Sequence, residues 1–537
     1  MLYSLPLGRH VSALLTAGVI VLAAPAVAAP GLSTFTLPLP SPGNGMYHPD
    51  VQSSFPSVDW TTLDRLYLPA GHFKFIRLGN LPMRTAEHPL VITNQGGQVR
   101  VGGLGHYYNF VIGGGTHWRL TGRYDADAAT GDAGFPGHAG GYANSRDRYG
   151  ILIDDSRGDE GPSGLAVGGG ASDFELDFLE IRHVGFAGML IKTDDDGDAT
   201  MANVRIHDNY IHDVGSEGFY IGSTQGEPQH TFTGLRLYNN RVIRTGTEAL
   251  QLGQLGDDCE IFNNVFLFGA IDWKNPFQNF QDNNTQHGGR FGDISIHHNL
   301  FIGGASHFLI FFGQDRTGDT HTPGDTQRIE HNYFSHGRNT GVYVHSAGDG
   351  VSTYRFADNA FRELDFQYGE LNPSATDHDA IFRIFNTANP IELVDNRWQG
   401  GETFAHITGG ASVTQSGNVN GPIAPVDFID SGFPADFDYL RLEIWTDVTS
   451  SGDPVEYQTG DYVSHEGALY RALVTHTDQI PPHAATWQAL PMPADDVRLT
   501  LASPFQHHGL LDNPGSLALF TNGFETGTTD AWSSVAR

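Results

Sequence analysis

Glu217 and Glu248 are the two residues of this sequence whose type and spacing best suit acid–base chemistry. Each directly precedes a short apolar-rich segment, at residues 218–222 and 249–253, and the two segments share one pattern. If the segments stack, the carboxyl groups stack too, which is costly unless they share a proton or a cation. The pair could supply the acid and the base or nucleophile that cleave a glycosidic bond, or hold calcium against a uronate carboxylate. Alternatively, both residues simply cap turns or meet arginines.

A lyase would also need a base that removes the α-proton of a uronate. Four residues of the surrounding repeats have suitable side chains: Lys192, His287, Arg290 and His345. Outward positions of the same repeats would contact the substrate: Tyr220, Gln251, Gln286, His307 and Tyr343. These residue types predict a groove of mixed polar and aromatic groups.

An acidic run, Asp194–Asp198, is the candidate calcium site. The carboxylates of Asp194, Asp196 and Asp198 lie around a Gly turn and offer several hard oxygen ligands to one ion. The distal glutamate of an EF-hand loop is missing, and any calcium bound here would be structural. A solvated acidic loop is the alternative interpretation.

The strongest pattern is a short phrase that recurs at intervals of 24 to 37 residues. Its fourth residue is always asparagine: Asn209, Asn240, Asn264, Asn299, Asn332, Asn359 and Asn396. Such spacing suits coils of constant cross-section that carry loops of different length. Equivalent residues would then stack, and inward asparagines would form a ladder that bonds backbone groups of the neighbouring coils.

A second phrase follows the first, at residues 188–192, 218–222, 249–253 and 341–345, with a further match at 150–154. Period-two alternation buries its second and fourth residues and turns the third and fifth outward. The two phrases predict an all-β chain, a right-handed parallel β-helix. Over about residues 100–430 they resemble pectate lyases, polygalacturonases, alginate lyases and chondroitinase B. The resemblance implies a solenoid that binds polysaccharide along one face, and it leaves the reaction open.

Residues 448–491 have a different pattern: Tyr-x-x-Gly-Asp-x-Val from Tyr457, Gly-x-x-Tyr-x-Ala around Tyr470, and a closing Trp487. This pattern resembles the small β-sheet modules of carbohydrate-binding families 5 and 12. The resemblance implies binding to chitin or cellulose through Tyr457, Tyr470 and Trp487, whose rings would stack on sugars. In so small a domain the same aromatics could instead form the core. The module would be inserted near the C-terminus, before a closing β-helix segment at 492–520 and a tail at 521–537.

The N-terminus and the charge limit the class of protein. Residues 1–28 have the apolar run and the Ala-Val-Ala cleavage motif of a signal peptide, which predicts a secreted protein. No later stretch is apolar enough to span a bilayer. The net charge of −31 argues against nucleic acid as a partner.

The remaining chain is expected to contain an N-terminal cap with the first coils at 29–100 and the main β-helix at 101–447, and to be a monomer. The predicted function is that of a secreted lyase or glycoside hydrolase of a polysaccharide, with calcium as the one suggested cofactor. The alternative is a non-catalytic carbohydrate-binding or adhesion protein that uses the same groove and the C-terminal module.

Overall fold

The structure is a computed structural model that describes residues 31–40, 50–103, 107–137, 147–155, 161–225, 228–275, 281–304, 307–311, 325–345, 352–364, 380–385, 388–423, 427–429, 437–438, 441–449, 451–490 and 498–500. The predicted signal peptide and tail lie outside these residues. Of the predicted closing segment only β44 (Arg498–Thr500) is described, paired antiparallel with β37 (Asp427–Ile429). Within the described ranges, no helix is long and apolar enough to cross a membrane.

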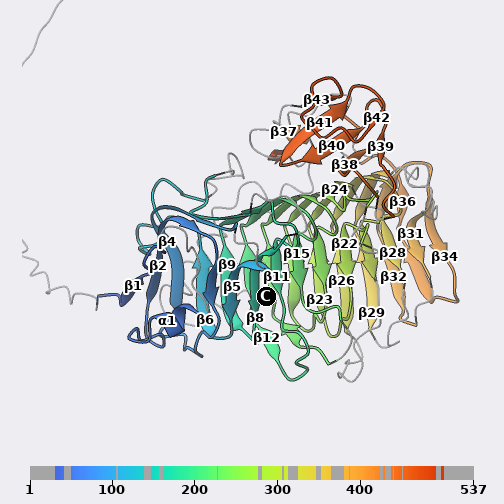
Figure 1. The fold of residues 1–537 in the computed structure, drawn as a ribbon. Helices are drawn as coiled ribbons and strands as arrows, with labels where there is room; N and C mark the ends of the chain where they lie inside the picture. Colours follow the sequence, from blue (N-terminus) through green and yellow to red (C-terminus); the bar gives the residue numbers. More distant parts are fainter. Residues whose placement is uncertain are drawn as a thin grey trace, which may run out of the picture.

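The chain winds into a right-handed parallel β-helix, as the repeated phrases predict (Figure 1). One coil consists of β13 (Arg205–His207), β14 (Tyr210–Val214) and β15 (Phe219–Ile221). Each of these strands pairs in parallel with its counterpart one coil later: β17 (Arg236–Tyr238), β18 (Arg241–Thr245) and β19 (Leu250–Leu252). Each coil therefore contributes one strand to each of three faces.

The first face is an 11-stranded parallel sheet: β3 (Ile76–Leu78), β5 (Tyr108–Gly113), β8 (Ser163–Gly168), β11 (Met189–Ile191), β15, β19, β22 (Thr285–His287), β25 (Leu309–Phe311), β28 (Val342–Val344), β31 (Ala380–Ile384) and β34 (Thr403–Ile407). The second runs through β6 (Thr116–Thr121), β9 (Ser172–Asp177), β13, β17, β20 (Cys259–Phe262), β23 (Ile294–His297), β26 (Thr326–Glu330), β29 (Thr353–Ala357), β32 (Ile391–Val394) and β35 (Val413–Ser416). The third runs through β7 (Ile151–Asp154), β10 (Leu179–Arg182), β14, β18, β21 (Val265–Gly269), β24 (Leu300–Gly304), β27 (Tyr333–Gly337), β30 (Ala360–Leu364), β33 (Arg397–Gln399) and β36 (Val419–Asn420). At the N-terminal end lie β1 (Thr34–Thr36), β2 (Arg65–Phe73), β4 (Leu90–Val101) and a short helix, α1 (Val51–Ser54).

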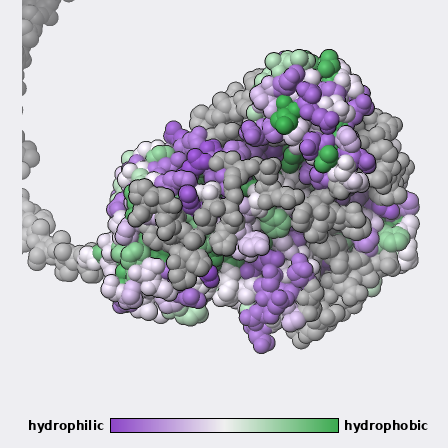
Figure 2. Space-filling model, viewed as in Figure 1, coloured by the Kyte–Doolittle hydropathy of each residue, from purple (hydrophilic) through white to green (hydrophobic). Residues whose placement is uncertain are grey.

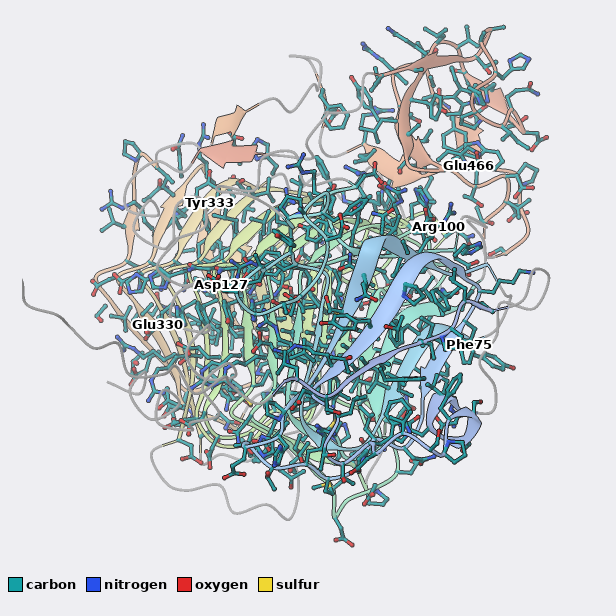
Figure 3. All side chains as sticks on the ribbon, turned by 90° about the vertical axis from the view of Figure 1, so that its left-hand side faces the viewer. Phe75, Arg100, Asp127, Glu330, Tyr333 and Glu466 are labelled. Carbon is teal, nitrogen blue, oxygen red and sulfur yellow. The ribbon has the colours of Figure 1, made fainter. Side chains whose placement is uncertain are left out.

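Figure 3 looks along the solenoid from its N-terminal end. Phe75 precedes β3 of the 11-stranded sheet, Glu330 ends β26 of the second face, and Tyr333 begins β27 of the third. Phe75 lies on the right of the cross-section, and Glu330 and Tyr333 lie on the left (Figure 3). The 11-stranded sheet therefore presents its outer face away from the other two.

The predicted asparagine ladder is confirmed and extends one coil further, to Asn418. Each ladder asparagine donates its backbone N–H and its Nδ2–H to Oδ1 of the next, at 3.0 to 3.1 Å for Asn264 and Asn299. The last bonds run from Asn396 to Asn418. The residue before each of the seven predicted asparagines has φ between 52° and 55°, a conformation that asparagine and aspartate tolerate better than most residues. The recurring asparagine and the residue before it thus form the corner between the second and third faces in each of these coils.

The match at residues 150–154 is assigned wrongly by the sequence pattern. These residues form β7, which pairs with β10 on the third face, and β8 takes the expected place beside β11. Apolar alternation is common to all three faces of a β-helix, so the pattern alone does not identify the face.

The C-terminal module is a small sheet of β38 (Leu442–Ile444), β40 (Tyr462–His465), β41 (Ala468–Ala472) and β43 (Trp487–Ala489), with β39 (Glu456–Tyr457) paired to β42 (His476–Thr477). Because β38 belongs to this sheet, the module begins before residue 448. It lies against the third face of the solenoid (Figure 1). Leu442, Tyr462 and Leu469 share one apolar cluster with Ile243 and Leu267.

Candidate functional site

Glu217 and Glu248 occupy the same position in successive coils. Phe219 pairs with Leu250, and the N–H of Gly218 donates to the carbonyl of Glu248 at 2.9 Å. Neighbouring strands lie about 4.8 Å apart. Both glutamates are almost fully buried, with 1% and 0% of their surface exposed. The stacking inferred from the sequence is therefore present, at the corner where the third face turns into the 11-stranded sheet.

Amide side chains from a later coil contact both carboxyl groups. Gln281 donates to Oε1 of Glu217 at 3.4 Å, and Gln286 donates to Oε1 of Glu248. Among the described residues, Oε2 of neither glutamate has a hydrogen-bond partner. A buried carboxyl oxygen without a partner is unusual in a purely structural residue.

Burial raises the pKa of both carboxyl groups. For Glu217, burial outweighs the hydrogen bonds to the carboxyl group and the nearby ammonium of Lys192, which lower the pKa. For Glu248, burial and the charge of Glu217 together raise the pKa well above its usual range. The pair therefore holds at least one proton more readily than two exposed glutamates would.

The predicted row of side chains is present on the outer side of the 11-stranded sheet, but four of its members are buried rather than exposed, with 5 to 8% of their surface exposed: Leu190, Tyr220, Gln251 and Gln286. Strand register aligns Leu190, Tyr220, Gln251 and Gln286, and further along the sheet Tyr343. We call this set the outer row. Tyr220 is tied to its neighbour in the row because its hydroxyl and the amide of Gln251 both bond Oγ1 of Thr224, at 2.7 and 2.8 Å.

Lys192 lies at the edge of this row. Its Nζ is 4.3 Å from the centre of the Tyr220 ring and 3.1 Å from Oδ2 of Asp194. The Lys192 side chain is 12% exposed. The ammonium is thus close to the carboxylate pair and can contact a ligand on the outer face.

His287 and Arg290 lie inside the solenoid, which corrects the expectation that they line the groove. His287 pairs with Leu252, an inward position, and packs edge-on against Phe311. Burial and the charge of Arg290 lower the pKa of His287 to about 3. Arg290 is fully buried and donates to the hydroxyl of Tyr354 at 2.8 and 3.1 Å. Neither side chain can reach a polymer on the outer face.

His307, Tyr343 and His345 form a second group, several coils beyond the carboxylates. The rings of His307 and Tyr343 lie 5.0 Å apart, and those of Tyr343 and His345 lie 5.2 Å apart. Arg383, which sequence reasoning missed, lies over the Tyr343 ring at 4.5 Å. Residues 381–385 fit the second phrase with Arg383 at its outward third position, so the signal was available.

The acidic run Asp194–Asp198 is an exposed loop that leads into β12 (Thr200–Ala202). Figure 2 shows strongly hydrophilic surface near β12. Within the loop, Asp196 accepts a hydrogen bond from the N–H of Asp198. Calcium binding here stays a prediction.

In the described part of the chain, the one group whose donor atoms converge as a metal site would is Glu175, Asp177 and His207, on the second face. The guanidinium of Arg119 is bonded to both carboxylates, at 2.9 and 2.5 Å. Burial lowers the pKa of His207, but its contacts with Asp208 at 2.7 Å and with Glu175 at 3.3 Å outweigh burial and raise the pKa to about 9. Cationic side chains already neutralise this cluster.

The three aromatic residues that were expected to stack on sugars are in the core of the module. Tyr457, Tyr470 and Trp487 are buried together with Val455 and Val463. The indole N–H of Trp487 donates to a backbone carbonyl, and the Tyr457 hydroxyl donates to another. Since a domain of this size needs its large side chains inside, the core interpretation is the correct one for these residues.

Comparisons with known proteins add a likeness of fold. No family model matches the chain. No curated protein matches it either. An alginate lyase from a Paenibacillus species is 15% identical with a TM-score of 0.37, over 68% of this chain and 95% of that one. A lacto-N-biosidase from Eubacterium ramulus is 10% identical with a TM-score of 0.41, over 68% of this chain and 63% of that one. An exopolygalacturonase from Thermotoga maritima is 10% identical with a TM-score of 0.30, over 66% of this chain and 84% of that one.

Proposed function

We propose that this chain is a secreted enzyme that cleaves a polysaccharide, with Glu217 and Glu248 as its acid–base pair. The observation that carries the proposal is the stacking of two buried carboxyl groups, each with a raised pKa and an oxygen that no described residue bonds. Such groups mark functional sites more often than structural ones. The outer row beside them offers the amide and aromatic side chains that bind sugars.

The two glutamates have different roles in this proposal. Lys192 stabilises the charged form of Glu217, and the charge of Glu217 in turn keeps the proton on Glu248. Because the pKa of Glu248 is raised the more strongly, we assign Glu248 as the general acid and Glu217 as its partner, the nucleophile. Carboxyl groups about one strand spacing of ~4.8 Å apart suit a retaining glycoside hydrolase, which needs about 5 Å, better than an inverting one.

The reaction then has two steps. Glu248 gives its proton to the glycosidic oxygen while the carboxylate of Glu217 attacks the anomeric carbon, so that the leaving chain departs as an alcohol. Glu248, now ionised, takes a proton from water as the water attacks the glycosyl ester, which releases the sugar and restores both groups.

A lyase is the second candidate, and the position of Lys192 supports it. Its ammonium lies on the outer face beside Tyr220 and could serve as the base once deprotonated. His345 is also exposed on this face. Calcium held by the glutamates would belong to this alternative, whereas calcium at Asp194–Asp198 would be structural in either case.

Non-catalytic adhesion is the third hypothesis, in which the protein would bind a glycan through the same face together with the module. Because the aromatics of the module are buried, binding to chitin or cellulose would have to use its exposed residues, such as Leu473 and Val474.

The test is to incubate the protein with a panel of neutral and acidic polysaccharides, with and without calcium, and to follow reducing ends together with the ultraviolet absorbance of unsaturated uronates. Reducing ends without absorbance are expected, and both signals together would indicate the lyase. Glu217→Gln and Glu248→Gln should each lower the rate about a thousandfold, within the range for loss of an acid–base group.

Glu466→Gln is the matched control, because Glu466 is exposed on the module (Figure 3) and should leave the rate unchanged. Full activity of both site variants would place catalysis elsewhere. Binding without any turnover would favour adhesion.

A further inference from the structure

Two neighbouring tyrosines near the N-terminal end of the 11-stranded sheet have exposed side chains. Tyr107 has 80% of its surface exposed and Tyr108 has 37%. Tyr108 begins β5, and the carbonyl of Tyr107 accepts a hydrogen bond from Ser163 at the start of β8. The backbone of this pair is therefore fixed in the sheet while the rings reach solvent.

Strand register places Tyr108 in line with the carboxylate pair. Tyr108 pairs with Ser163, and the N–H of Gly164 donates to the carbonyl of Ala187. The N–H of Gly188 in turn donates to the carbonyl of Glu217. Tyr108 is thus three coils before Glu217 at the same position, a distance of about 14 Å at ~4.8 Å per strand.

The surface between the tyrosines and the glutamates is apolar. The outward positions of β5 and β8 are Val111 and Ala166, both half-buried. Ala166 adjoins a cluster on the outer face made of Ala187, Leu190 and Tyr220. The partly buried ring of Phe186 packs against the same cluster. An apolar surface therefore lies between the two ends, and an extended chain could run along it.

We propose that Tyr107 and Tyr108 form a distal binding platform for the same glycan chain, several sugar units away from the bond that is cleaved. The pyranose ring has an apolar face that stacks on an aromatic ring, while the tyrosine hydroxyls can bond sugar hydroxyls. The inference rests on the proposed function, and it adds that the substrate is a long polymer rather than a short oligosaccharide.

The platform predicts that chain length decides the effect of mutation. Binding is measured on the Glu248→Gln protein by electrophoresis through gels that each contain carboxymethyl cellulose, glycol chitin, xylan, alginate or polygalacturonate. The polymer that retards this protein most is then hydrolysed with acid, and its disaccharides are tested by calorimetry. Tyr107→Ala with Tyr108→Ala should weaken polymer binding at least about tenfold, which equals about 1.4 kcal/mol, and should leave disaccharide binding unchanged.

Two variants control for the loss of an exposed ring. Tyr124 lies on the loop after β6 with 36% of its surface exposed, and Tyr124→Ala should bind the polymer as the parent does. Tyr108→Trp in the presence of Tyr107 keeps a flat ring and should retain the affinity. Both should melt at the temperature of the parent protein.

Equal polymer binding by the double variant and the parent would overturn the platform while leaving the proposed function intact. An equal loss for polymer and disaccharide would also overturn it, because a distal platform cannot act on a ligand too short to reach it. If no gel retards the parent, the proposed function fails and the platform fails with it.

Discussion

Replacing Asn299 by alanine tests how far the asparagine ladder stabilises the solenoid. The Oδ1 of Asn299 accepts two hydrogen bonds from Asn264, both at 3.0 Å. Its Nδ2 donates to the carbonyls of Ile261 and His297 and to Oδ1 of Asn332, at 3.0 to 3.1 Å. The variant loses these five contacts and leaves a buried backbone N–H without an acceptor. At about 1 kcal/mol for each contact, and allowing for two donor hydrogens shared among three acceptors, the expected loss is about 4 kcal/mol.

The control is Asn418→Ala at the end of the ladder. Asn418 makes the same kind of bonds to Asn396, but it is only half-buried, so water can replace its amide and the expected loss is about 1 kcal/mol. Urea unfolding of both variants, followed by far-ultraviolet circular dichroism, compares the two losses. Equal losses, or a loss below about 1 kcal/mol for Asn299→Ala, would show that the ladder does not carry the stability assigned to it here.

Three further predictions concern other parts of the chain. His207 has a pKa of about 9 in the folded protein against 6.5 when unfolded. Its contribution of about 3 kcal/mol to the free energy of unfolding is therefore complete below pH 6.5 and lost as pH rises through 9. The melting temperature of His207→Gln should lack this alkaline decline, and identical pH profiles for variant and wild type would contradict the assignment. Trp487→Ala should unfold the module, at a cost of about 3 to 5 kcal/mol, seen as lost near-ultraviolet dichroism; a folded variant that only loses chitin binding would contradict its core position. If calcium binds at Asp194–Asp198, chelation should lower the melting temperature of the wild type but not of Asp196→Asn, and an unchanged wild type would remove calcium from the account.

The sequence predicts the parts of this fold that follow from periodicity. An asparagine such as Asn264 recurs at one corner of every coil because the same backbone groups need partners there each time. The outward position of Tyr220 and Gln251 follows from alternation in the same way. These features depend on local pattern and on the stacking of identical coils, and both can be read from one chain.

The errors concern side chains whose surroundings come from distant segments. The sequence predicts His287 as a candidate base in the groove. The residue is instead at the fourth and inward position of its phrase, where Gln327 bonds it at 3.2 Å. Arg290 is buried because Tyr354 supplies a hydroxyl from more than sixty residues away. The aromatics of the module show the same limit, since a tyrosine such as Tyr457 suits a sugar site and a small core equally well. The polarity of a side chain does not show whether it is buried when its hydrogen-bond partner comes from a distant part of the sequence.

The position of the module links it to the carboxylate pair. Ile444 donates its N–H to Ile271 at 3.1 Å, and a side chain at Gly246 would meet Cδ1 of Ile444 at 3.2 Å. Gly246 is two residues before Glu248 on the same turn, and residues 270–272 bond that turn through their backbone N–H groups. An ion pair between the partly exposed Lys274 and the buried Glu443 joins the same two surfaces at 2.5 Å. These contacts hold the module against the turn that carries Glu248. We therefore expect a shift of the module to disturb the turn that carries Glu248.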